Sequence, residues 1–257
     1  MESKDIKDII LKAKQDKQTE LELFNMGLTY LPEEIQQLTD LTALYLENNH
    51  FTAFPESIKQ LPNLQILSLE YNHVKTLPDE IGNLKYLKKL NLANNDIEFL
   101  SDTIGQFTEL QTLDLRVNAL SALPESLRRL EKLEILYLGR NQFQQLPDIL
   151  SQLTKIKDLG AGGNQINQIP EWISNFNHLQ YLSFSRNHIV SVPDTLQSLK
   201  KLEHLILREN KLDTFPTVIK HLNNLSLLDL RGNLFSDNNN VLKHVHSPNE
   251  IIQAYTK

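Results

Sequence analysis

The chain has 257 residues, of which 40% are hydrophobic and 23% charged, a composition typical of soluble globular proteins. Its formal net charge of −6 argues against a general affinity for nucleic acid or anionic membranes, because both require a cationic surface. The absence of cysteine excludes thiolate catalysis, cysteine-ligated zinc and disulfide bonds, and it fits a reducing compartment.

The first predicted element is an amphipathic helix within residues 1–17. Ile6, Ile9, Ile10 and Ala13 fall at i, i+3, i+4 and i+7, which places them on one helix face that would cover the N-terminal end of the core. This segment lacks the apolar run of a secretory signal, and no stretch reaches the roughly 18 consecutive apolar residues that span a bilayer. We therefore expect a cytoplasmic protein without membrane insertion.

A repeat of 23 residues follows over residues 18–235. Asparagine recurs at this interval without insertion, at Asn49, Asn72, Asn95, Asn118, Asn141, Asn164, Asn187, Asn210 and Asn233. The frame around these asparagines is LxxLxLxxNxLxxLPxxIxxLxx, and from Pro32 to Pro216 Ser101 is the one replacement at the proline position. Nine repeats carry the full frame, and one degenerate repeat, with Met26 at the asparagine position, precedes them.

Each part of this frame has a physical explanation. The Leu-x-Leu segment alternates as a β-strand with one buried face does. The asparagine amide both donates and accepts hydrogen bonds, so it can satisfy backbone groups that would cost roughly 1–3 kcal/mol each if buried unpaired. Proline suits the first position of a short helical or 3₁₀ turn. A single repeat cannot bury its leucines alone, so stacked repeats form one core and one parallel sheet.

The pattern resembles the leucine-rich-repeat family, in the short LPxxI class found in Ras-suppressor and Scribble-type scaffolds, plant intracellular Ras-group proteins and bacterial homologues. The resemblance covers about residues 18–235. It implies an α/β fold, a right-handed curved solenoid of horseshoe shape. Its parallel β-sheet would be concave, its short helical or 3₁₀ turns would lie on the convex side, and helical caps would close both ends. It also implies a module that binds proteins.

Residues 236–257 are predicted to form a C-terminal cap. Asp237–Asn240 is expected to be a loop, and the run Ser247–Glu250 is a capping box with Pro248 at the first helical position. Ile251, Ile252 and Tyr255 would then face the last repeat. No linker or low-complexity tract is present, so we expect the caps and repeats to form a single structural domain, by default a monomer.

Motifs for catalysis or for cofactors are missing from the sequence. The run Gly160–Gly163 is not followed by Gly-Lys-Ser/Thr, so it is not a phosphate-binding loop, and its register makes it a strand of the seventh repeat. The histidines, including His50, His73, His188 and the pair His244 and His246, show no metal-ligand pattern. We predict no metal, no cofactor and no enzymatic activity.

Residues between the buried leucines point to the solvent side of the predicted sheet, and they are the candidate partner-binding residues. On this face Glu20, Glu22, Glu47 and Glu70 lie towards the N-terminal end, whereas arginines lie towards the C-terminal end. Two alternative interpretations remain: the charges are sorted by chance, or they form a dipolar groove that orients a partner. Tyrosine and arginine are enriched at binding hot spots. The candidates are Tyr45, Glu47, Glu70, Tyr71, Arg116, Tyr137, Arg140, Gly162, Tyr181, Arg186, His204, Arg208 and Arg231.

The seventh repeat departs from the others. Gly160, Gly162 and Gly163 occupy its surface positions, which predicts either a bare strip that a ligand approaches closely or a merely degenerate repeat. Ala161 replaces a core leucine, and we expect Phe184, at the equivalent position of the next repeat, to fill the volume.

Three hypotheses about function follow. The leading one is a non-enzymatic signalling module or scaffold that binds a partner protein on its concave face. The second is a receptor for a small molecule or glycan held at the strip around Gly162. The third is a bacterial effector that acts by binding a host protein. The sequence identifies no partner, because function does not follow from fold alone.

Overall fold

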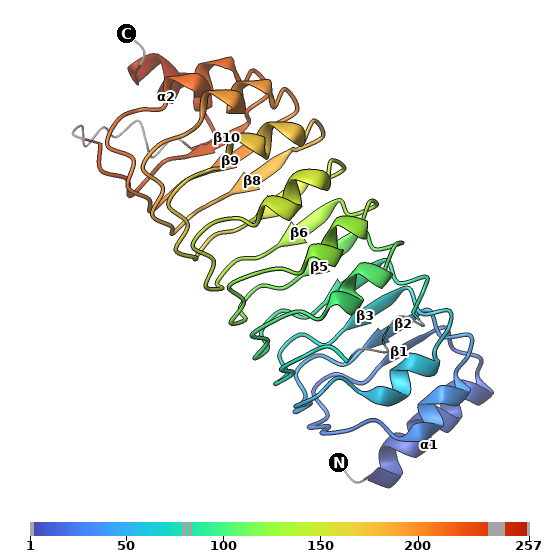
Figure 1. Cartoon of the computed structure of the whole chain (residues 1–257). Coiled ribbons are helices and arrows are strands. Elements are labelled where there is room, and N and C mark those ends of the chain that lie inside the picture. The colour runs from blue at the N-terminus through green and yellow to red at the C-terminus, as the bar shows by residue number, and fades with distance from the viewer. Residues whose placement is uncertain (1–2, 79–80, 82–83, 236–244, 256–257) are drawn as a thin grey trace. The chain divides into compact units, whose positions relative to one another are not determined.

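The computed structural model describes residues 3–78, 81, 84–235 and 245–255, and the chain divides into two compact units, Met1–Leu133 and Glu134–Lys257. We call these the N-terminal unit and the C-terminal unit. Both units alternate three-residue β-strands with five-residue 3₁₀ helices, labelled η (Figure 1).

The elements follow one another in the same order in both units. Those of the N-terminal unit are α1 (Ser3–Gln15), β1 (Glu20–Glu22), η1 (Glu33–Gln37), β2 (Ala43–Tyr45), η2 (Glu56–Gln60), β3 (Ile66–Ser68), β4 (Lys89–Asn91), η4 (Asp102–Gln106), β5 (Thr112–Asp114) and η5 (Glu125–Arg129). Those of the C-terminal unit are β6 (Ile135–Tyr137), η6 (Asp148–Gln152), β7 (Asp158–Gly160), η7 (Glu171–Asn175), β8 (Tyr181–Ser183), η8 (Asp194–Ser198), β9 (His204–Ile206), η9 (Thr217–His221), β10 (Leu227–Asp229) and α2 (Pro248–Tyr255).

Within each unit the strands pair in parallel and in chain order. Leu44 pairs with Leu67 between β2 and β3, and Leu159 pairs with Leu182 between β7 and β8. Paired residues are therefore one repeat length, 23 positions, apart in the sequence. Leu44 and Leu46 are fully buried, whereas Tyr45 between them is partly exposed. This is the alternation expected for strands with one buried face. The predicted solenoid of stacked repeats is therefore confirmed within each unit.

The repeat asparagines connect neighbouring turns as expected. The Asn49 side chain accepts a hydrogen bond from the Leu28 N–H at 2.9 Å and donates to the carbonyl oxygens of Leu23 at 2.8 Å and Leu46 at 3.0 Å. Asn49 itself is only 2% exposed. One amide therefore satisfies buried backbone groups of its own repeat and of the preceding one, which would otherwise be left without partners.

The prolines take a different position from the one predicted. Pro55 is the N-cap of η2 rather than its first residue, and its carbonyl oxygen accepts the Ile58 N–H at 3.1 Å. The extended backbone of Pro55 (ψ 112°) lets that carbonyl close the 3₁₀ turn, and an N-cap needs no N–H of its own. Where Ser101 replaces proline, its Oγ accepts from the Thr103 N–H at 3.4 Å.

Helices stand at both ends of the described chain. In α1, the side chains of Ile6, Ile10 and Ala13 are each 1% exposed, and α1 packs against η1. Lys7 of α1 forms a 2.6 Å ion pair with Glu34 of η1. Neither helix has the length and apolar character needed to cross a membrane, within the residues that the structure describes.

The C-terminal helix begins at Pro248, as the sequence predicts. The Ser247 carbonyl accepts the Glu250 N–H at 3.0 Å, Ile251 is fully buried, and the Tyr255 ring stacks on Phe215 with a centroid distance of 4.9 Å. The expected loop at Asp237–Asn240 and the side chain of His244 lie outside the described residues. The assignment of residues 1–17, 18–235 and 236–257 to cap, repeats and cap of one domain stays a prediction.

Candidate functional site

We use the term sheet face for the solvent side of the strands together with the two residues that directly precede each repeat asparagine. In the second repeat this face consists of Ala43, which is itself buried, and of Tyr45, Glu47 and Asn48, and the other repeats present the equivalent residues at 23-residue steps. The leucines that alternate with them are buried and build the core. The side chains of the sheet face are therefore the part of the repeat that the hydrophobic core leaves free to vary.

The last position of the sheet face has left-handed backbone in most repeats. Tyr71, Val117, Arg140 and Arg186 have φ values of 53°, 55°, 55° and 56°. The N–H groups of Tyr71, Arg140 and Arg186 still pair with the next repeat, for example that of Tyr71 with the Ala93 carbonyl at 3.1 Å. The hydrogen-bond ladder thus holds a conformation that non-glycine residues adopt at a cost, and the cost is greatest for the β-branched Val117.

The sheet face of the N-terminal unit is acidic at β1 to β3. Glu20, Glu22, Glu47 and Glu70 form no ion pair with any described residue, although Glu70 accepts hydrogen bonds from the side-chain amides of Asn91 at 2.8 Å and Asn94 at 3.2 Å. The Glu47 Oε2 atom is buried without a hydrogen-bond partner. We call these four residues the glutamate patch, and they leave uncompensated negative charge on this part of the face.

Aromatic side chains lie beside the glutamate patch. Phe24 is 44% exposed and Tyr71 is 57% exposed, so both rings offer apolar surface beside these carboxylates. Burial, together with the charges of Glu20, Glu47 and Glu22, raises the pKa of Tyr45. A cavity of about 250 Å³ is lined by Glu20, Glu22, Phe24, Asn25, Tyr45 and Glu47.

Most of the predicted arginines are paired with acidic neighbours. Asp114 is the last residue of β5 and pairs with Arg116, two residues further on. Asp229 is the last residue of β10 and pairs in the same way with Arg231, at 2.7 Å. These two aspartates are 6% and 5% exposed, and each also accepts the N–H of its arginine partner. A buried carboxylate without such a partner would be strongly destabilising, so both arginines have a structural role.

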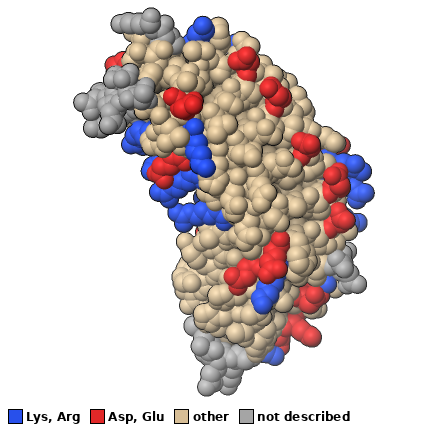
Figure 2. Space-filling view, turned by 60° about the vertical axis from the view of Figure 1, so that its left-hand side comes forward, with Lys and Arg blue, Asp and Glu red and all other residues tan. Residues whose placement is uncertain are grey.

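Two further arginines share one acidic partner in the C-terminal unit. Arg186 contacts Glu209 at 2.7 Å, and Arg208 pairs with the same carboxylate. Hydrogen bonds from Arg208 and Arg186 lower the pKa of Glu209. Figure 2 shows basic and acidic atoms side by side in the upper part of the molecule, which belongs to this unit. The arginines therefore contribute less net positive charge than their number suggested, which weakens the predicted dipole at its basic end.

The glycines of the seventh repeat do not form a bare strip, which was one of the two alternatives that the sequence left open. A Cβ atom at Gly160 would lie 3.0 Å from the Tyr137 ring, and one at Gly162 would lie 2.6 Å from Ser185 Oγ. Gly163 has a φ of 72° and lies against the Arg140 side chain. Neighbouring repeats therefore take up the space that missing side chains leave, and these contacts explain the glycines without a ligand.

A polar cluster on the sheet face of the C-terminal unit contains one residue that sequence analysis missed. The Tyr137 hydroxyl donates to Asp158 Oδ2 at 3.1 Å, and the Tyr181 and His204 rings meet edge to face with centroids 6.0 Å apart. Asp158, Tyr181 and His204 occupy the same strand position in successive repeats. That register was the signal that could have identified Asp158.

The histidines that follow the repeat asparagines have no arrangement for binding metal. The rings of His50 and His73 stack with centroids 6.4 Å apart, and His73 Nδ1 lies 3.3 Å from an Asp96 carboxylate oxygen. Within the described residues, no group of three histidine or carboxylate side chains is placed to hold a metal ion.

Comparisons with known proteins agree with this architecture. Residues 20–96 and 79–163 match a family model described as a leucine-rich repeat region, and residues 177–235 match a second model described as leucine rich repeat. A search of curated proteins gave no match.

Several solved structures have the same fold. The plant peptide hormone receptor RGFR1 in complex with RGF2 is 27% identical with a TM-score of 0.62, over 79% of this chain and 38% of that chain. The PEPR1–AtPEP1 structure is 28% identical with a TM-score of 0.67, over 84% and 35%. The functional domain of InlJ from Listeria monocytogenes is 22% identical with a TM-score of 0.72, over 90% and 48%. This chain therefore spans less than half the length of each of these neighbours.

Proposed function

The chain belongs to the leucine-rich-repeat family, and from this membership we propose that it is a non-enzymatic module whose partner protein binds along the sheet face. Leucine-rich-repeat proteins are generally binding modules and receptors. The proposal extends to a cytoplasmic, monomeric scaffold in signalling, which cell fractionation and size-exclusion chromatography would test.

The observation that carries the proposal is the glutamate patch with its exposed aromatic neighbours. Glu20, Glu22 and Glu47 have no ion-pair partner among the described residues, and Phe24 keeps 44% of its surface exposed. Leucines and asparagines already complete the fold, so these side chains add nothing to its core. Aromatic residues are enriched at protein interfaces, and charge beside them can complement the charge of a partner.

Two of the structural neighbours support the same conclusion. RGFR1 is a peptide hormone receptor whose structure was solved with RGF2, and PEPR1 was solved with AtPEP1. They are 27% and 28% identical to this chain, which covers 38% and 35% of their lengths. This likeness favours a protein or peptide as the ligand over a small molecule, and no contact around Gly162 favours the latter.

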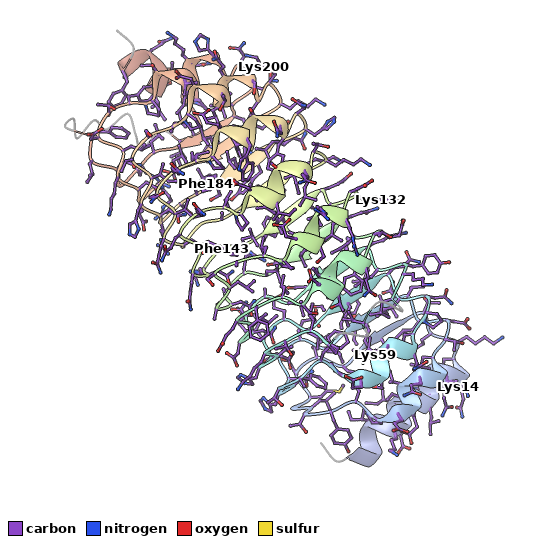
Figure 3. All side chains as sticks on the ribbon, in the orientation of Figure 1. Lys14, Lys59, Lys132, Phe143, Phe184 and Lys200 are labelled. Atoms are coloured by element: carbon purple, nitrogen blue, oxygen red, sulfur yellow. The ribbon has the colours of Figure 1, made fainter. Side chains whose placement is uncertain are left out.

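A crosslinking pull-down from native lysate tests the proposal. The intact chain is compared with two face variants, Glu22→Lys/Glu47→Lys and Tyr137→Ala/Arg186→Glu, after circular dichroism shows that each is folded. The control is Lys200→Glu/Lys220→Glu, because Lys200 lies just after η8 (Figure 3) and Lys220 lies within η9, both away from the strands of the sheet. We expect one protein to be captured by the intact chain and the control and lost by at least one face variant. Capture of the same protein by all variants, or by none, would contradict the proposal.

A further inference from the structure

Asp158 carries a carboxylate oxygen that finds no hydrogen-bond partner among the described residues. It is the first residue of β7, and its backbone is fixed because its N–H and that of Lys157 both donate to the Glu134 carbonyl, at 3.1 and 2.8 Å. Oδ2 accepts the hydrogen bond from Tyr137 at 3.1 Å, whereas Oδ1 is buried and accepts none. Leaving a buried acceptor unsatisfied costs stability, and the cost is larger for a charged group.

The repeat itself does not require an aspartate at this position. The equivalent residue in the other described strands is Glu, Ala, Ile, Lys, Thr, Ile, Tyr, His or Leu. A site that accepts such different side chains makes no structural demand for a carboxylate. Burial raises the pKa of Asp158, whereas the hydrogen bond from Tyr137 and the charge of His204 act in the opposite direction.

A cavity of about 300 Å³ lies next to Asp158 in the C-terminal unit. It is lined by Glu134, Ile135, Lys157, Asp158, Gln180, Tyr181, Glu203 and His204. The charge of Glu134 is compensated by Lys157 at 2.8 Å, whereas Glu203 has no ion pair among the described residues. The cavity therefore combines two uncompensated carboxylates with the aromatic ring of Tyr181. Its volume lies at the lower end of the range for ligand sites, about 300 to 1,000 Å³, and it can hold one long side chain.

We propose that this cavity accepts a basic side chain, arginine or lysine, from the partner protein, which pairs with Asp158 and lies against Tyr181. The inference rests on the proposed function and specifies the chemistry of one contact on the same sheet face. The carboxylate can turn towards the incoming cation because rotation about χ2 of aspartate is soft. Pairing supplies the missing hydrogen bond, and a cation beside an aromatic ring is attracted to its face.

An NMR titration of the intact chain with N-acetyl-arginine amide tests the proposal. N-acetyl-lysine amide is a second probe that distinguishes a guanidinium from an ammonium site, and N-acetyl-citrulline amide is the neutral control of similar shape. We expect saturable shifts centred on the Tyr181 and His204 signals with at least one of the two cationic probes and none with citrulline. Lys157→Ala should tighten binding, because it removes a competing cation and releases Glu134.

The variant Asp158→Asn separates a binding role from a structural one. We expect its affinity for the cationic probe to fall by about thirty-fold or more, the usual effect of truncating one partner of a buried charge pair. Its thermal stability at pH 7 should equal or exceed that of the intact chain, because the substitution removes an unfavourable buried charge. Asp194→Asn, the same change on exposed η8, should alter neither property.

Three outcomes would overturn the inference: equal binding of citrulline, undiminished binding by Asp158→Asn, or absence of saturable binding by either cationic probe. Failure here is distinct from failure of the proposed function. If the pull-down captures a partner that Asp158→Asn retains, the binding module stands and this cavity has no part in it. If the cavity binds the cationic probe but no protein is captured, the cavity stands and the proposed function fails.

Discussion

Replacing Asn187 by alanine removes one buried amide that connects two neighbouring repeats. In the intact chain this amide accepts the Ile166 N–H at 2.9 Å and donates to the carbonyl oxygens of Ala161 and Phe184, both at 3.0 Å. The two carbonyls keep other partners, since Asn164 also donates to Ala161 and Asn210 to Phe184. The Ile166 N–H has no second acceptor among the described contacts.

The expected loss of unfolding free energy follows from these hydrogen bonds. One buried N–H left without a partner costs about 1–3 kcal/mol, and the two lost donor contacts cost about 0.5–1.5 kcal/mol each, so we expect a loss of roughly 2–6 kcal/mol. The matched variant Asn233→Ala, at a partly exposed position in the last repeat, should cost less because water can replace the lost contacts.

Guanidinium denaturation followed by circular dichroism measures both losses, and native-state hydrogen exchange locates the effect. We expect the Ile166 amide to lose protection in Asn187→Ala while amides two repeats away keep theirs, because stability in repeat proteins is a sum of local and nearest-neighbour interactions. Equal losses for Asn187→Ala and Asn233→Ala, or unchanged exchange at Ile166, would refute the view that asparagine acts by satisfying buried backbone groups.

Three further predictions concern packing, backbone strain and charge. Val117→Asn should stabilise the chain by about 1 kcal/mol in a thermal melt, because asparagine tolerates the left-handed backbone at this position better than a β-branched residue does. Phe184→Ala should cost about 3–5 kcal/mol if Phe184 fills the volume beside Ala161, since both are fully buried, and a loss below 1 kcal/mol would contradict that role. Arg208→Gln should raise the Glu209 pKa towards its usual value. Because the folded pKa of Glu209 is lowered, this group stabilises the fold above its unfolded pKa, and that stability is lost as pH falls through the folded pKa. The variant should lose less stability over this pH range, and carboxyl NMR during an acid titration measures the Glu209 pKa itself.

Several features of this protein followed from the sequence because they depend only on the period. The 23-residue frame places Leu67 beside Leu44 and Asn72 one turn after Asn49, whatever the surrounding side chains are. Parallel strands, buried leucine columns and the asparagine ladder therefore follow from spacing alone. The helix around Ile10 could be predicted in the same way, because its apolar face repeats with helical period.

The side-chain contacts on the sheet face could be determined only from the tertiary structure. Sequence analysis placed Arg186 and Arg208 on this face but could not show that both pair with Glu209. It also left open whether Gly160 belongs to a bare strip, and only the structure shows the Tyr137 ring beside it. The assignment of the partner-binding residues to this face stays a prediction. Side-chain contacts between repeats depend on rotamers that no periodicity specifies, whereas backbone register requires only that every repeat have the same length.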